Sequence, residues 1–199
     1  MTKNTLPTRR MFLKSTGLGL AGLSLPSLGI AQGGNTVPNK PLAPELQVPQ
    51  WIDGQGKTQA PFSIAANKGK WIYLKCFQDW CPACHSVGFP NLQKLVEAFP
   101  DDSVVSKAVI QTTFEGFHTN THDALRKNQL EYGLNLPFGH DPGNEELPSN
   151  DPNHYPKTMV SYQTRGTPWV ILINPTGHIV FSDVHINIDK LIEHLQKIS

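Results

Sequence analysis

Residues 71–85 read WIYLKCFQDWCPACH, and this stretch decides the fold. Its first seven residues are almost all aromatic or aliphatic, which favours a buried central strand. Cys81 and Cys84 follow, with Pro82 between them. Proline suits the first turn of a helix, because the N–H that it lacks would be unpaired there. We therefore expect a strand over 71–77 and a helix that begins directly after Cys81.

The predicted helix has one apolar face. Four apolar residues between Leu92 and Phe99 recur at i, i+3, i+4 and i+7, which gives a single buried stripe. Pro90 lies inside this stretch and is expected to kink the helix, and Pro100 is expected to end it.

The rest of the chain alternates strands and helices. Asp53-Gly54 predicts the turn of a hairpin. Asn120 is the expected N-cap of a helix, with Asp123 favourable in its first turn. Residues 137–156 hold five prolines and few large apolar groups, so we expect a long loop, a feature that often carries function. Further strands are expected at 104–111, 169–173 and 178–181, and further helices at 120–132, 157–164 and 188–198. This order predicts an α/β fold with a mixed sheet.

The N-terminus has the features of an export signal. Residues 8–14, TRRMFLK, resemble the twin-arginine motif, Ser/Thr-Arg-Arg-x-Phe-Leu-Lys, at every specified position. Residues 15–30 are weakly apolar and interrupted by glycines, whereas a membrane-spanning helix needs about 20 apolar residues. We expect 1–31 to be a twin-arginine signal peptide that directs the chain to the periplasm or the outer face of the membrane.

Composition excludes several classes of protein. Of the 199 residues, 38% are hydrophobic and 17% charged, with a formal net charge of +1, which argues against a disordered chain and a basic nucleic-acid binder. Removing the signal peptide, with its four basic residues and no acid, changes the formal charge to −3. We expect no nucleic-acid partner and no membrane span after its removal. Residues 32–48 are polar and proline-rich and predict an extended linker before a domain at 49–199.

The cysteine pair predicts thiol chemistry. Cysteines at i and i+3 lie on one face of a helical turn, so that their sulfurs can meet in a disulfide. The unpaired N–H groups of a helix N-terminus favour a thiolate, which is the attacking species in disulfide exchange. We expect Cys81 to be an exposed catalytic nucleophile and Cys84 the catalytic thiol that resolves the mixed disulfide. No cofactor is expected.

Other roles for the pair stay open. It could be a static bridge, or half of a zinc site, although zinc needs about four ligands and the only other cysteine is Cys76. Soft thiolates also favour Cu(I), and a copper-binding protein or chaperone would use the pair with a distal histidine, His140 or His154. The spacing counts against this alternative, because such chaperones usually have three residues between their cysteines.

Taken together, the motifs resemble those of the thioredoxin-like superfamily, and most of all its TlpA-type exported redoxins. The resemblance spans about residues 44–198. It rests on Gly69-Lys70 before the central strand, Trp80-Cys81-Pro82-Ala83-Cys84, Gly166-Thr167-Pro168 before a later strand, and the turn Asn174-Pro175-Thr176-Gly177.

This resemblance implies a thioredoxin-like mixed β-sheet with helices on both faces, here with an N-terminal β-hairpin extension. It implies thiol–disulfide exchange with client proteins, as a reductase that draws electrons from a membrane donor. It also implies a cis Thr167–Pro168 bond beside the cysteines, with Trp80, Thr167 and Pro168 contacting the substrate.

Two residues depart from the family pattern. Lys75 stands where thioredoxin has a buried aspartate. Lys75 either points at the pair and favours the Cys81 thiolate or extends to solvent. Cys76 is the second departure, and we expect it to be a buried core residue.

Overall fold

A computed structural model describes residues 40–198. The predicted signal peptide at 1–31 and the first part of the predicted linker, 32–39, lie outside the described residues. No helix within the described part of the chain is long and apolar enough to cross a lipid bilayer.

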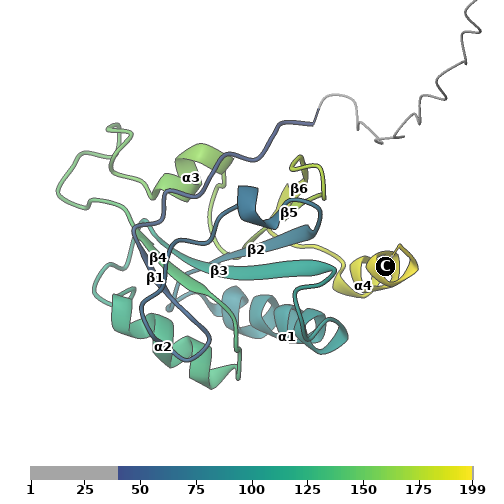
Figure 1. Cartoon of the computed structure of the whole chain (residues 1–199). Helices are drawn as coiled ribbons and strands as arrows, with labels where there is room; N and C mark the ends of the chain where they lie inside the picture. The colour runs from purple at the N-terminus through teal and green to yellow at the C-terminus, as the bar shows by residue number, and fades with distance from the viewer. Residues whose placement is uncertain (1–39, 199) are drawn as a thin grey trace, which may run out of the picture. The chain divides into compact units, whose positions relative to one another are not determined.

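Six strands form one mixed sheet in the order β1-β4-β3-β2-β5-β6 (Figure 1). The central strand β2 runs parallel to β3 and antiparallel to β5. The edge strands β1 and β6 each run antiparallel to their neighbour, whereas β4 runs parallel to β3. The strands are β1 (Gln50–Ile52), β2 (Trp71–Phe77), β3 (Val105–Thr113), β4 (Phe138–Pro142), β5 (Trp169–Ile173) and β6 (Ile179–Asp183).

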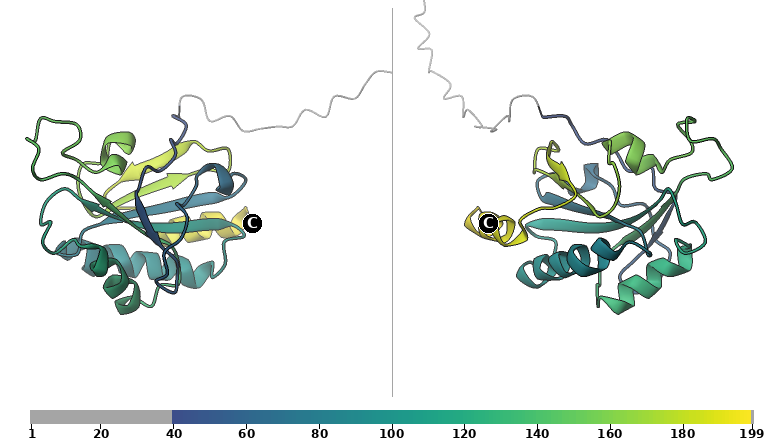
Figure 2. Two further views of the ribbon diagram at one scale, coloured as in Figure 1. Left: turned by 60° about the vertical axis from the view of Figure 1, so that its left-hand side comes forward. Right: turned by 180° about the vertical axis from the view of Figure 1, so that it is seen from behind.

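Helices cover both faces of this sheet, as expected. Three of them, α1, α2 and α4, lie on one face and α3 lies on the other (Figures 1 and 2). A 3₁₀ turn, η1, precedes β2, and a π-helical turn, η2, leads into α1. The bounds are η1 (Ala65–Asn67), η2 (Cys84–Gly88), α1 (Phe89–Ala98), α2 (His122–Glu131), α3 (Lys157–Tyr162) and α4 (Ile188–Lys197).

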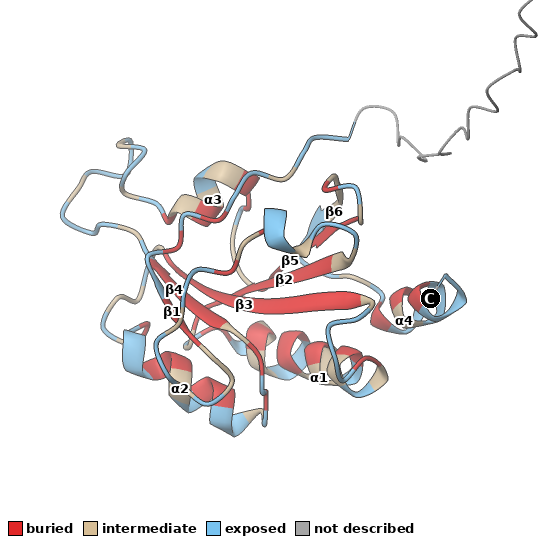
Figure 3. Cartoon of the chain, viewed as in Figure 1, coloured by how far each residue is buried: buried red, intermediate tan, exposed pale blue. Residues whose placement is uncertain are grey.

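The apolar run at 71–77 is continuous because β2 is buried on both faces (Figure 3). Tyr73 and Phe77 belong to the core under α1, α2 and α4. Leu74 and Cys76, which alternate with them, belong to the core on the α3 face. The prediction of Cys76 as a buried core residue is confirmed.

One expectation is wrong: the first part of the predicted loop at 137–156 is strand β4. Phe138 is fully buried and its ring packs edge-on against Phe77, 6.1 Å between centroids. The polar residues that follow find partners inside the protein, since His140 Nδ1 lies 2.7 Å from Gln111 Oε1 and the Asp141 carboxylate accepts from the backbone N–H groups at the start of α3. Residues 143–156 form the long loop.

The start of α2 also differs from the expectation. Thr121 occupies the N-cap position instead of Asn120, and Asp123 lies in the first turn as predicted. Asn120 is buried because its side-chain amide donates to the carbonyls of Glu115 and Gly116. The amide therefore serves the loop before the helix and is not available to cap it.

The predicted hairpin turn is present in short form. The Asp53 carboxylate accepts from the backbone N–H groups of Gln55 and Lys57, and the chain returns to a single bridge between Ile52 and Thr58. The main partner of β1 is β4.

The end of the predicted linker packs against the domain. Leu46 and Val48 are buried, and the Glu45 carboxylate accepts from the backbone N–H groups of Ile64 and Ala65. The Pro41 carbonyl accepts from Ile179 N–H at the start of β6. Residues 40–48 therefore contribute to the fold.

His140 gives the fold a pH-dependent stability. Burial, with a further contribution from His122, lowers the pKa of His140 to about 4, below its ordinary value near 6.5. As pH falls through this window, the unfolded chain binds a proton that the folded chain does not, so the free energy of unfolding decreases. We expect His140→Gln to remove about 1–3 kcal/mol of this decrease, measured by denaturant unfolding at pH 4 to 7. The exposed His118, as His118→Gln, is the matched control. The same slope in both variants would contradict the assignment.

Candidate active site

The cysteine pair lies where β2 ends and the helix begins. Cys81 precedes the first two helical residues, Pro82 and Ala83, as the sequence predicts. The backbone N–H of Cys84 donates to Cys81 Sγ at 3.2 Å and to the Cys81 carbonyl at 3.0 Å. This amide of the first helical turn is therefore shared between the Cys81 carbonyl and the Cys81 sulfur, and a contact of this kind at a helix N-terminus favours a thiolate.

The Thr167-Pro168 loop reaches the same sulfur from the start of β5. Cys81 Sγ donates to the Thr167 carbonyl at 3.4 Å. The Thr167–Pro168 bond is cis, as the resemblance implied. Thr167 Oγ1 also donates to Gln78 Oε1 at 3.2 Å, so the loop is held to the end of β2. The structure thus brings together the two cysteines, Thr167 and Pro168 from segments more than 80 residues apart.

Cys81 is less exposed than predicted. It retains 4% of its accessible surface and Cys84 retains none, so Cys81 is the only one of the two that solvent reaches. The Thr167 carbonyl on one side and the first helical turn on the other account for its burial. Trp80, by contrast, is 44% exposed. Its indole lies over Gly116, whose positive φ of 60° and close approach leave no room for a side chain.

Burial controls the titration of the deeper thiol. It raises the pKa of Cys84 to about 12, and the charge of Lys75 acts in the opposite direction. Burial likewise raises the pKa of Cys76 to about 12, on the other face of the sheet. All three cysteines are free thiols in the structure.

Lys75 points into the protein beneath the helix, so the alternative that it extends to solvent is wrong. Its side chain is fully buried, and Nζ lies 5.6 Å from the centroid of the Phe89 ring. A Cβ at Gly88 would lie only 2.2 Å from Nζ, so glycine at this position makes room for the amine. Among the thiols, Cys84 has the largest electrostatic effect on Lys75, larger than the predicted partner Cys81.

The helix that packs over Lys75 is irregular at its start. Phe89 N–H donates to the Cys84 carbonyl, five residues back, which closes the π-helical turn η2. Pro90 follows at the start of α1 and has no N–H to continue the ladder. The irregularity expected at Pro90 is thus found in the turn just before it, between Cys84 and Pro90.

A polar network holds the loop between β2 and the cysteines. Asn120 Oδ1 accepts from Asp79 N–H at 2.6 Å, and the Asp79 carboxylate accepts from Asn128 Nδ2 at 2.7 Å. His85 is placed between the Asp79 carbonyl and Tyr132 Oη, with each ring nitrogen 2.6 Å from its partner. His85 is therefore fixed by hydrogen bonds beside the pair.

Sequence analysis missed two residues of this site, Gln78 and Asn120. Both are buried amides, and Gln78 Nε2 donates to the Glu115 carbonyl at 3.0 Å. In the sequence Gln78 resembles an ordinary loop residue, and Asn120 resembles a helix N-cap. The one available signal was that Gln78 stands between a fully buried strand and the first cysteine.

The copper alternative requires His140 or His154 to join the cysteine pair as a third ligand, and residues 40–198 contain no such group. Within residues 40–198, no group of three or more His, Cys, Asp or Glu side chains gathers as a possible metal site. His140 Nδ1 is paired with Gln111, and His154 Nδ1 with the Leu147 carbonyl at 2.8 Å. The distal histidines are therefore engaged elsewhere.

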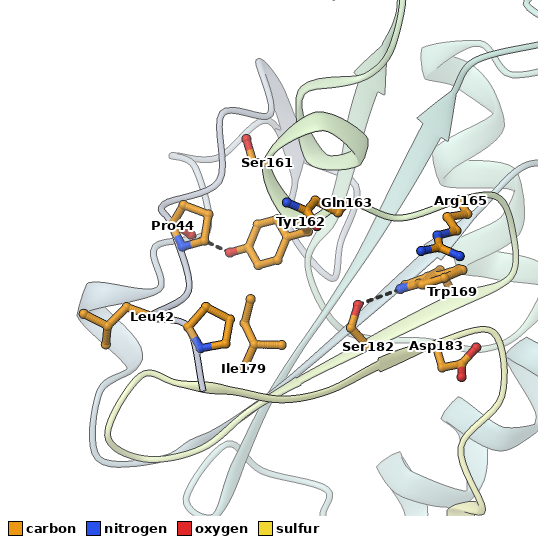
Figure 4. Close-up of a pocket in the computed structure, with 11 residues that line it drawn as sticks. Leu42, Pro44, Ser161, Tyr162, Gln163, Arg165, Trp169, Ile179, Ser182 and Asp183 are labelled. Carbon is orange, nitrogen blue, oxygen red and sulfur yellow. Dashed lines mark hydrogen bonds between the residues drawn. The ribbon is translucent and has the colours of Figure 1, made fainter. Parts of the chain in front are cut away.

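A pocket of about 500 Å³ lies between α3, β6 and residues 41–44, and its lining includes residues on either side of the Thr167-Pro168 loop in the sequence (Figure 4). Arg165 and Trp169, which flank the loop, both line it. Two hydrogen bonds cross its wall, from Tyr162 Oη to the Pro44 carbonyl and from Trp169 Nε1 to Ser182 Oγ (Figure 4). No cysteine lines this pocket, so it is separate from the thiol site.

Comparison with known proteins identifies the fold and the family. No protein-family model and no curated protein sequence matches the chain. Among solved structures, a thioredoxin-like superfamily protein matches with 31% identity and a TM-score of 0.65, over 78% of this chain and 94% of that protein. A thiol-disulfide isomerase from Corynebacterium glutamicum matches with 28% identity and a TM-score of 0.66, over 80% and 96% of the two chains.

A more distant match shows the fold alone. It is a secreted disulfide oxidoreductase from Mycobacterium tuberculosis, with 19% identity and a TM-score of 0.51, over 74% of this chain and 94% of that protein. The mixed six-stranded sheet with helices on both faces agrees with the fold of these matches. The chain belongs to the thioredoxin-like superfamily, and it is a thioredoxin-like oxidoreductase.

Proposed function

We propose that this chain is an exported thiol–disulfide oxidoreductase of the TlpA type, which reduces disulfides in client proteins through Cys81 and Cys84. One observation carries the proposal: Cys81 Sγ lies between the N–H of Cys84 and the carbonyl of Thr167 at the only solvent-reached point of the pair. The amide stabilises a thiolate at Cys81, and the loop offers its backbone to a client chain.

The reaction takes place in two steps. The Cys81 thiolate attacks one sulfur of a client disulfide, the client S–S bond breaks, and the other client sulfur leaves as a thiolate and takes a proton from water. The Cys84 thiolate then attacks Cys81 Sγ in the mixed disulfide and displaces the second client thiolate. Two electrons have passed to the client, and Cys81 and Cys84 are joined by a disulfide. In this scheme Trp80, Thr167 and Pro168 contact the client.

Cys84 itself adds little stabilisation to the reduced pair, as a reductase requires. A pair becomes a strong oxidant when its reduced form is stabilised. Here burial raises the pKa of Cys84 to about 12, so its thiolate receives little stabilisation in the resting reduced protein. A dithiol donor must return the two electrons after each cycle, and we place that donor in the membrane.

Export through the twin-arginine route agrees with this chemistry. An oxidising compartment supplies disulfides for a reductase to act on. Residues 8–14 carry the targeting motif, and the domain follows after residue 31. The periplasm or another extracytoplasmic space is the proposed location.

Replacing the resolving cysteine tests the two thiol roles. In Cys84→Ser, Cys81 still attacks but nothing releases the client, so mixed disulfides should accumulate. We expect non-reducing electrophoresis of periplasmic extract to show higher-mass adducts that disappear on reduction. The Cys76→Ser variant is the matched control, because Cys76 lies in the opposite core and should form no part of the exchange.

Adducts in Cys81→Ser as abundant as those in Cys84→Ser would reverse the assigned roles. An absence of adducts in every variant would contradict the proposal that the chain exchanges disulfides with client proteins.

The reduction potential tests the direction of electron flow. For a reductase we expect a value close to that of thioredoxin, about −270 mV, measured by equilibration with a dithiol buffer. A value close to about −120 mV, typical of a strong oxidant, would contradict the reducing direction.

The targeting motif gives a separate test. Replacing Arg9 and Arg10 together with lysine keeps the charge but removes the guanidinium groups of the motif. We expect the variant to remain in the cytoplasm of a host that has the twin-arginine pathway, as seen by immunoblotting of cell fractions. The Lys14→Arg variant, which keeps both arginines, is the control. Equal amounts of wild type and double variant in the periplasm would contradict this route.

A further inference from the structure

Two lysines are buried on neighbouring strands of the sheet, and they differ in their surroundings. Lys107 on β3 donates from Nζ to the carbonyls of Phe99, Asp101 and Val105 and forms an ion pair with Asp102 at 3.1 Å. Its charge is therefore fully compensated. Lys75 on β2 has no hydrogen-bond partner for Nζ within residues 40–198.

An unpartnered buried amine costs stability, so a structural role does not account for Lys75. Its position points to the thiols. Nζ rests against Gly88, which ends the π-helical turn that Cys84 begins, and residues four apart in a helix share a face. The ring of Phe89 covers it from the same helix. Pro168 approaches the same point, since a Cβ at Gly88 would lie 3.4 Å from the Pro168 Cβ.

We propose that the Lys75 amine is the internal proton acceptor for Cys84 in the step that resolves the mixed disulfide. This inference rests on the proposed function of the pair. It assigns a task to the one buried cationic side chain of the described residues that lacks a hydrogen bond.

The step is balanced without any further reactant. The neutral amine takes the thiol proton of Cys84 and becomes an ammonium ion. The thiolate so formed attacks Cys81 Sγ, a Cys81–Cys84 bond forms, and the bond between Cys81 and the client sulfur breaks. The client leaves as a thiolate, and the ammonium ion returns its proton to that thiolate or to water as the client departs.

The charges around both groups are consistent with this exchange. Burial lowers the pKa of Lys75, while the thiols of Cys84, Cys76 and Cys81 act to raise it. Burial raises the pKa of Cys84, while Lys75 lowers it and Cys81 raises it. Cys76 and Tyr132 are the other titratable groups in electrostatic contact with Cys84. Burial thus disfavours the charged form of both groups, and forming the thiolate and the ammonium ion together lowers the cost of each charge.

The two steps can be separated with an aromatic disulfide, 5,5′-dithiobis(2-nitrobenzoate). Attack by Cys81 releases one coloured thiolate, and resolution by Cys84 releases a second, so stopped-flow absorbance records each step. In Lys75→Met we expect the second phase to slow by at least about tenfold at pH 7, because the loss of a general base typically costs 10²–10⁴-fold. Its rate should then rise about tenfold per pH unit, since solvent must supply the base, and raising the pH should restore it.

The controls separate this role from a general loss of charge or fold. Lys94→Met removes one exposed cation from α1 and should leave both phases unchanged. Lys75→Gln is the second variant, with an amide that accepts no proton at these pH values. Thermal unfolding of each variant checks the fold.

A second phase in both Lys75 variants with the wild-type rate and pH dependence would overturn the inference. Failure of the proposed function would look different. In that case the wild type would release only one equivalent of coloured thiolate, or Cys84→Ser would still release two.

Discussion

The burial of β2 on both faces is the constraint on which this structure depends. A strand with no exposed face must place every side chain in a core, and most of residues 71–77 do so as apolar groups. Gln78 directly follows the strand, and its side-chain amide accepts a hydrogen bond from the Thr167 hydroxyl and donates one to the Glu115 carbonyl. The loop that carries Cys81 therefore starts from a fixed residue and has little conformational freedom. This restriction places Cys81 Sγ 3.4 Å from the Thr167 carbonyl.

The two cysteines differ in environment, although they are one turn apart. Cys81 Sγ accepts a hydrogen bond from the Cys84 N–H and is reached by solvent, whereas Cys84 is fully buried. Stabilisation of a thiolate by a fixed dipole and its destabilisation by desolvation are opposite effects. A single helical turn at the edge of a core supplies both, and this difference underlies the separate roles that we propose for the two cysteines.

Much of the fold could be predicted from the sequence, because its strongest elements have local signals. The structure confirms the strand at 71–77 and the helix that begins directly after Cys81, and it also confirms the cis Thr167–Pro168 bond that the family resemblance implied. Strand β4 was missed because its polar residues, His140 and Asp141, are paired with distant groups that no local pattern reveals.

The missed parts of the site have the same cause. Asn120 reads as a helix cap in sequence, yet its amide is taken by the preceding loop and by Asp79. The direction of Lys75 depends on a space at Gly88, which lies on another element thirteen positions later. Partners that meet only after folding cannot be found from one sequence by periodicity alone.

The contact between Lys75 and Gly88 also limits how this chain can diverge. A methyl group at position 88 would overlap the amine nitrogen of Lys75, so the lysine side chain would have to shift to accept any larger residue at 88. A homologue with a shorter residue on the strand gains room for alanine or serine on the helix. Among homologues, we therefore expect a larger residue at position 88 to occur together with a smaller residue at position 75.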